Sequence, residues 1–128
     1  INCSYSAKSL EIWDYLSIFN IKVGIINMPT TYPPKPVNGF MISHSLLEDK
    51  NFTFPKYLEK ELKSKFNYRI MPRILAKVDK DKAIKECFDV TKIRFDVLKY
   101  LYRKFNPDFI HMTIFETDHL QLPIINNQ

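Results

Sequence analysis

The chain has 128 residues, eight prolines, only two glycines and a formal net charge of +5. This length is typical of one domain, and a content of 45% hydrophobic and 14% aromatic residues predicts a packed core rather than a disordered chain. The glycines, Gly24 and Gly39, stand fifteen positions apart. Dinucleotide-binding fingerprints, phosphate-binding loops and nucleophile elbows each need two or more glycines close together, so the sequence excludes all three.

No stretch of this sequence has the composition of a signal peptide or a membrane span. The longest apolar runs are a few residues, far below the ~20 that a membrane-spanning helix needs. Cys3 and Cys87 are two thiols in a chain without a dense cysteine framework, which favours reduced thiols over the alternative of one disulfide. We therefore expect a cytoplasmic protein with no membrane partner.

Positive charge is concentrated in one part of the chain. Residues 50–104 carry sixteen Lys and Arg against seven Asp and Glu, whereas the remainder carries three against seven. One interpretation is a lysine-rich helical face in contact with solvent. The alternative is a binding surface for nucleic acid or an acidic protein partner. The sequence has no aromatic-basic recognition motif, so the solvated face is favoured and nucleic acid is not the expected partner.

The first predicted element is a helix over residues 9–20. Ile12, Leu16 and Phe19 recur at helical spacing, and Trp13 broadens this apolar stripe. Ser9 is the expected N-cap. Residues 21–28 are rich in β-branched side chains and almost uncharged, which is typical of a short strand buried on both faces of a parallel sheet. A helix, a tight turn and such a strand together indicate an α/β fold.

Residues 29–40 form a proline-rich loop. Four of these twelve residues are proline, which excludes a helix or a central strand and predicts an extended, polyproline-like path that ends in a tight turn at Asn38-Gly39. A loop that directly follows a buried strand lies where α/β proteins place binding residues, and Tyr32 is its best candidate for a side chain near a pocket. A spacer, or a ligand for a proline-reading domain, is equally compatible with the sequence.

The second half of the chain predicts two helices and a strand. Residues 41–55 are irregular, 57–66 form a helix with Leu58, Leu62 and Phe66 on one face, and 67–78 are ambiguous. Asp79 caps a long helix that ends before Asn106-Pro107 and lies across a sheet. Its expected sheet-facing row is made of large apolar residues and one threonine: Ile84, Phe88, Thr91, Phe95, Leu98, Tyr102 and Phe105.

A final strand over residues 109–116 precedes the main candidate site. Asp118 and His119 directly follow this strand, and the carboxyl ends of parallel strands are where open α/β sheets bind ligands. A carboxylate and an imidazole are both ligands of zinc or manganese, so we predict a metal site at Asp118 and His119; solvated loop residues are the alternative. His111 is expected to be a hydrogen-bonded core or sheet residue rather than a ligand. His44 is expected to be a solvated loop residue, with approach to a substrate as the alternative.

Two segments of the chain resemble the type I phosphodiesterase/nucleotide pyrophosphatase family, which belongs to the alkaline phosphatase superfamily. The first segment is a helix with Ile-Trp-Asp and Leu-Ser (residues 12–17), a strand ending Asn-Met-Pro (27–29), then Tyr-Pro-Pro (32–34) and Val-Asn-Gly (37–39). The second is a long helix, Pro-Asp-Phe (107–109) and a strand that ends in Thr-Asp (117–118). The resemblance covers residues 11–121.

The resemblance implies metal-dependent hydrolysis of phosphodiester or pyrophosphate bonds in nucleotides or other phosphodiesters. In such enzymes a Thr or Ser attacks phosphorus while two divalent metals, usually zinc, neutralise charge on the transferring group. The carboxylate at the position of Asp118 binds one metal, together with a histidine four residues later. In this chain the second position is Leu122, which has no ligand atom.

The residues that supply the nucleophile and the other metal ligands in that family have no counterpart in these 128 residues. The resemblance therefore implies that residues 1–128 are one incomplete piece of a larger catalytic domain, inactive alone; a truncated relative that has lost the site is the alternative. Its fold would be a partial alkaline-phosphatase-like three-layer α/β fold with short, mostly parallel buried strands and flanking helices. Sheet edges left open by missing strands would favour a homodimer.

Overall fold

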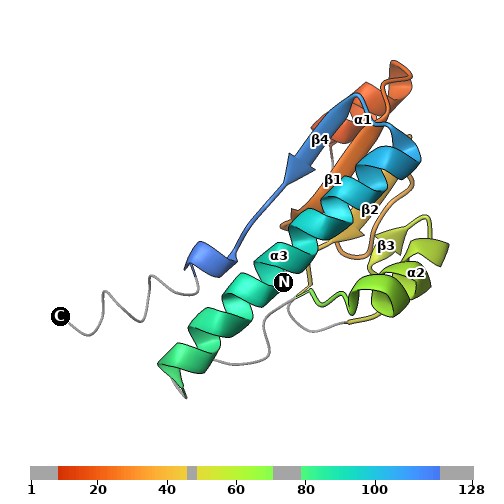
Figure 1. Ribbon diagram of the computed structural model, residues 1–128. Helices are drawn as coiled ribbons and strands as arrows, with labels where there is room; N and C mark the ends of the chain where they lie inside the picture. The colour runs from red at the N-terminus through yellow and green to blue at the C-terminus, as the bar shows by residue number, and fades with distance from the viewer. Residues whose placement is uncertain (1–8, 46–48, 71–78, 119–128) are drawn as a thin grey trace.

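The computed structural model describes residues 9–45, 49–70 and 79–118 (Figure 1). Their helices and strands are, in chain order, α1 (Ile12–Ile18), β1 (Val23–Met28), β2 (Gly39–Ser43), β3 (Thr53–Phe54), α2 (Tyr57–Phe66), α3 (Lys80–Phe105) and β4 (Phe109–Met112). The expected long helix and the helix over 57–66 are confirmed. Asp79 caps α3 by accepting a hydrogen bond from the backbone N–H of Lys82 at 3.1 Å.

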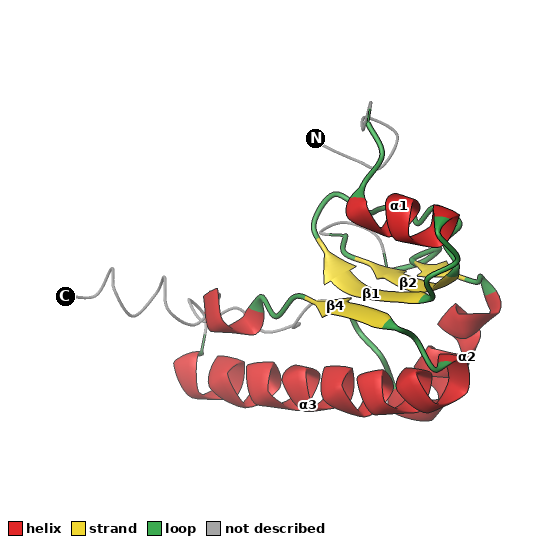
Figure 2. Ribbon diagram, turned by 90° about the horizontal axis from the view of Figure 1, so that it is seen from above, coloured by secondary structure: helices red, strands yellow, loops and turns green. Residues whose placement is uncertain are grey.

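Within the described residues the four strands form one mixed sheet in the order β3-β2-β1-β4. The central strand β1 is parallel to both β2 and β4, and β3 adds to β2 in the antiparallel direction. α1 covers one face of this sheet, and α3 with α2 covers the other (Figure 2). The chain is therefore a three-layer α/β structure with mostly parallel strands, as the sequence predicts at this coarse level.

The core is divided by the sheet into two clusters. The larger cluster lies between the sheet and the α2/α3 layer and contains ten buried residues: Ile26, Phe40, Ile42, Phe52, Leu58, Leu62, Tyr68, Ile70, Val97 and Leu101. The smaller cluster lies under α1 and contains four: Trp13, Val23, Ile25 and Met41. β1 supplies both clusters because successive side chains of a strand point to opposite faces, so the prediction of a strand buried on both faces is confirmed.

The prediction of a tight turn at Asn38-Gly39 is refined by the structure, in which Gly39 is the first residue of β2. Gly39 has φ +138°, and a Cβ there would lie 1.9 Å from the carbonyl oxygen of Val23. Glycine is required at this position because the two parallel strands approach each other too closely for any side chain. The strand β2 was not expected, since residues 41–55 lack a clear strand pattern; only the pairing with β1 fixes Phe40, Met41 and Ile42 in extended form.

The row of α3 predicted to face the sheet is wrong: the buried row is displaced from it by about one residue along the helix. The buried row is Ala83, Cys87, Val90, Arg94, Val97 and Leu101. Phe88, Phe95 and Tyr102 of the predicted row are exposed instead. Both rows repeat at helical spacing, so periodicity alone could not choose between them, and the larger aromatics gave the wrong choice. Cys87 is buried within this row of α3.

The first helix is shorter than predicted. α1 begins at Ile12 and is capped by Glu11, whose backbone N–H donates to the Asp14 carboxylate at 2.9 Å; Ser9 is not the cap. Of its predicted stripe, Trp13 is buried and Leu16 is half-buried, whereas Ile12 and Phe19 are exposed. A seven-residue helix has room for only a narrow contact with the sheet, because two turns present few side chains to one face.

Candidate functional site

The carboxyl ends of the three parallel strands meet at one edge of the sheet. The register pairs Ile26 of β1 with Ile42 of β2 and with Met112 of β4, so the residues that follow these positions come together. They include Asn27, His44 and Thr113. This is the edge at which open α/β sheets bind ligands, and it is the candidate functional site.

Asn27 joins the three strand ends. Its side chain is fully buried, and its backbone lies in the left-handed region (φ 62°), where the β1–β2 register shifts. Its Nδ2 donates to the carbonyl oxygen of Thr113 at 3.2 Å, and its Oδ1 lies 2.9 Å from Nδ1 of His44. Asparagine tolerates positive φ better than other side chains, so the bulge and the crosslink both suit this residue type.

The contact with Asn27 orients the imidazole of His44. Since Nδ2 of Asn27 donates to a carbonyl, Oδ1 is the atom that faces His44, and Nδ1 must therefore carry the proton. In the neutral ring this places the lone pair on Nε2. The ring also stacks on Phe115, with centroids 4.4 Å apart. An imidazole fixed by an amide oxygen is a suitable base, hydrogen-bond acceptor or metal ligand.

Hydroxyl groups hold the loop that leaves β1 against the end of β2. The Thr31 hydroxyl donates to the carbonyl oxygen of Met28 at 2.6 Å, and the Ser43 hydroxyl donates to that of Thr31 at 2.8 Å. Thr31 and Ser43 are both buried. Because these bonds satisfy buried polar groups, they fix the start of the proline-rich loop and with it the position of His44.

The structure can be compared with the predictions for three residues: His111, Tyr32 and His44. His111 is half-buried in β4, and its Nε2 lies 3.0 Å from the Thr113 hydroxyl, so the prediction of a hydrogen-bonded sheet histidine is confirmed. Tyr32, joined to Pro33 by a cis peptide, packs against the larger core cluster and is half-buried. The expectation that His44 is a solvated loop residue is wrong, because Asn27 and Phe115 both hold its ring.

Asp118 does not directly follow a strand, as the sequence predicted. β4 ends at Met112 rather than at residue 116, and a helical turn starts at Glu116. Asp118 is exposed in this turn, whereas its proposed partner His119 and the position of Leu122 lie outside the described residues. Among residues 9–45, 49–70 and 79–118, no three His, Cys, Asp or Glu side chains are grouped closely enough to hold a metal ion.

A buried ion pair fixes the segment between β4 and Asp118. Arg94 of α3 is fully buried; its Nε donates to Oε1 of Glu116 at 2.8 Å, and its Nη1 donates to the Tyr68 hydroxyl at 2.9 Å. Nη2 donates to the carbonyl oxygen of Ile70. Burial raises the pKa of Tyr68, an effect that the Arg94 charge opposes. This pair is not among the residues predicted from sequence, although an arginine at helical spacing between Val90 and Val97 is a usable signal for it.

The fold and this edge define the chain as a mixed α/β protein with a polar, hydrogen-bonded site at its carboxyl strand ends. No protein family, no curated protein and no solved structure matches it. Among the described helices, none combines the length and the apolar character needed to cross a membrane.

Proposed function

We propose that this chain is part of a metal-dependent phosphodiesterase or nucleotide pyrophosphatase domain of the alkaline-phosphatase-like type, and that it does not hydrolyse phosphodiesters alone. One observation carries the proposal: the two segments that bear the family resemblance meet at one strand edge, where Asn27 and Thr113, 86 residues apart in sequence, are hydrogen-bonded. That edge carries an oriented imidazole and leads directly to Asp118.

The role proposed for each residue follows from its position in the chain and in the fold. Asp118 supplies a carboxylate to a divalent metal, with zinc as the expected ion, and His119 is its neighbour in sequence. His44 faces the phosphoryl group of the substrate, and Asn27 is the positioning residue that fixes its tautomer. Hydrolysis requires a nucleophile and further metal ligands that these residues do not include, so the isolated chain is inactive.

The lack of activity is tested with bis-p-nitrophenyl phosphate and added zinc. We expect no turnover above background from the purified chain. Turnover that Asp118→Ala abolishes would contradict the proposed inactivity, because it would show a complete catalytic site.

The relation to metal-dependent phosphodiesterases is tested by restoring the missing ligand. Asp118 and position 122 are four residues apart, a spacing that puts two side chains on one face of a helical turn. Leu122→His should therefore tighten zinc binding at least ~10-fold, since the new imidazole binds the metal together with the Asp118 carboxylate. The matched control Leu120→His adds the same imidazole at the wrong spacing. Equal zinc affinities of the two variants in a dialysis titration would contradict the proposed site.

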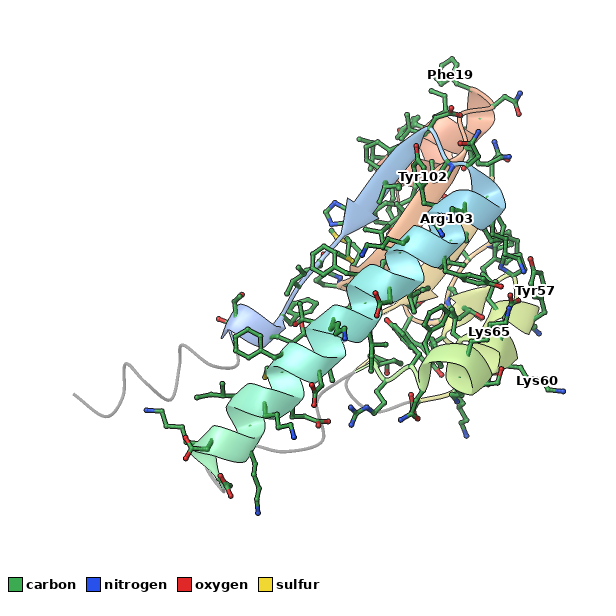
Figure 3. The ribbon with its side chains drawn as sticks, viewed as in Figure 1. Phe19, Tyr57, Lys60, Lys65, Tyr102 and Arg103 are labelled. Atoms are coloured by element: carbon green, nitrogen blue, oxygen red, sulfur yellow. The ribbon has the colours of Figure 1, made fainter. Side chains whose placement is uncertain are left out.

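A second candidate function rests on the outer surface of α2 and α3. Lys60 and Lys65 of α2 and Arg103 of α3 lie there, and the ring of Tyr57 on α2 is half-exposed (Figure 3). Basic groups with exposed aromatics suit an anionic macromolecule such as nucleic acid. Lys65 and Lys104 contribute less charge to this surface, because both pair with Glu61, at 3.7 and 2.9 Å.

A gel-shift titration with single-stranded DNA or RNA decides this second function. Binding that weakens steeply between low and physiological salt, and that the Lys60→Glu/Arg103→Glu variant loses, would support it, because phosphate contacts release counterions. A control reversal outside α2 and α3, Lys22→Glu in the turn before β1, should leave such binding unchanged. Binding that is absent, or equally reduced by both variants, would contradict it.

A further inference from the structure

One edge of the sheet has no neighbouring strand in the described part of the chain. The strand order ends at β4, which pairs with β1 alone. The backbone N–H groups of Phe109 and Thr113 donate to the β1 side, at Lys22 and Ile26. Because the backbone groups of successive strand residues face alternate sides, those of His111 also face β1. The N–H and C=O groups of Ile110 and Met112 therefore point outward, away from the sheet.

This edge lacks the features that usually prevent edge pairing. Its sequence, Phe-Ile-His-Met, contains no lysine, proline or acidic residue, and its register with β1 is continuous. The opposite edge is different: β3 has only two residues and is followed directly by Pro55 and Lys56. Short strands, prolines and lysines are the usual protection of an edge, so β3 is protected and β4 is open to another strand.

An exposed aromatic row lies on the flank of α3 that faces this edge. Phe88, Phe95 and Tyr102 recur every seven residues and are 70%, 41% and 50% exposed. Tyr100 contacts Phe66 of α2, and a residue two positions further along a helix points about 200° away. Tyr102 therefore faces away from α2, toward the side of the molecule where β4 lies (Figures 1 and 3).

We propose that β4 pairs with β4 of a second copy of this chain, in the antiparallel direction about a two-fold axis at His111. In this register Ile110 lies opposite Met112 of the partner subunit, and each such pair exchanges two backbone hydrogen bonds. The two outward residues stand symmetrically on either side of His111, so the edge is complementary to itself and all four hydrogen bonds form without a shift. A single closed two-fold contact also leaves no open edge at β4.

The same two-fold axis brings apolar surface together. The two α3 helices lie on the same face of the joined sheet, with their aromatic flanks toward one another. Backbone hydrogen bonds between the strands replace hydrogen bonds to water and so add little net stabilisation, and burial of exposed rings such as Tyr102 supplies the larger share. This proposal does not depend on the phosphodiesterase function, because it uses neither Asp118 nor His44.

The first test measures the oligomeric state by sedimentation over a range of concentrations. The unaltered chain should be a dimer at high concentration. Ile110→Pro removes an outward N–H that β1 does not use, so it should raise the dimer dissociation constant at least ~10-fold and leave the fold intact. The matched control Ile110→Ala keeps the N–H and should remain dimeric. A monomer at all concentrations, or equal dissociation constants for the two variants, would overturn the proposal.

The second test fixes the register and remains decisive if Ile110→Pro does not fold. His111 faces His111 of the partner subunit in a pair without hydrogen bonds, with Cα atoms about 4.5 Å apart, which is within reach of a disulfide. In a Cys3→Ser background, His111→Cys should form an intermolecular disulfide under mild oxidation, detected on a non-reducing gel. Ile110→Cys faces Met112 of the partner subunit and should not. No crosslink, or equal crosslinking at both positions, would overturn the proposed register.

Discussion

On one face of the sheet, α2 and α3 bury ten residues in one cluster; on the other, α1 helps to bury four. The α2/α3 face also contains the Arg94–Glu116 ion pair, which is excluded from water. Both faces leave large apolar side chains in solvent: Ile18 and Phe19 are 68% and 75% exposed on the α1 face, and Phe88 is 70% exposed on α3. The two faces differ in the size of the buried cluster, so most of the stabilisation of the described fold comes from the α2/α3 face. We expect Ile18 and Phe19 to add little to stability and to be available for contact with other protein.

The largest expected effect comes from breaking the ion pair of the α2/α3 face. Arg94→Ala leaves the Glu116 carboxylate buried without its partner and should lower the free energy of unfolding by about 3–5 kcal/mol. Urea denaturation followed by circular dichroism measures the loss. The double variant Arg94→Leu/Glu116→Leu removes both charges and should recover most of it. A loss below about 1 kcal/mol in the single variant would show that the pair is not buried in solution.

A matched pair of leucines compares the two faces directly. Leu62 is fully buried in the larger cluster, and Leu16 is half-buried against the smaller one. Leu62→Ala should cost about 2–5 kcal/mol because it opens a cavity between α2 and the sheet, whereas Leu16→Ala should cost about 1 kcal/mol. The same urea titration measures both. Equal losses would mean that α1 contributes as much stability as the opposite layer.

Alkaline titration tests the buried polar cluster of the α2/α3 face. Burial raises the pKa of Tyr68 above its ordinary value of 10.0, so the folded state holds this proton more tightly than the unfolded state. The contribution of the protonated Tyr68 to the free energy of unfolding is therefore complete below pH 10 and is lost as the pH rises above that value. Tyr68→Phe should be less stable at neutral pH, because Arg94 loses a partner, and its deficit should shrink above pH 10. A constant deficit across this range would contradict the raised pKa.

The smallest expected effect lies on the α1 face. Phe19→Ser replaces a side chain that is three-quarters exposed, so it should change the free energy of unfolding by less than about 0.5 kcal/mol. Reduced self-association or higher solubility with unchanged stability would support the interpretation of this face as a contact surface. A loss above about 1 kcal/mol would show that Phe19 is buried in solution.

Within the described residues, several elements could be predicted from sequence because local signals determine them. Asp79, Pro55 and Asn106 mark helix boundaries through capping and backbone restrictions that act within a few residues. The strand from Val23 to Met28 is defined by a run of apolar residues, and α3 by its length and period. The α/β class followed from the helix, the tight turn and the buried strand predicted over residues 9–28.

Other features depend on contacts between residues far apart in the chain, so they could be seen only in the folded structure. β2 exists because β1 pairs with it, Gly39 is required by the carbonyl of Val23, and the choice between two equally periodic rows of α3 depended on burying Arg94 with Glu116 and Tyr68. The candidate site has the same origin. Asn27, His44 and Thr113 carry no shared motif, and they meet because parallel strands end at one edge and a buried amide must find partners there.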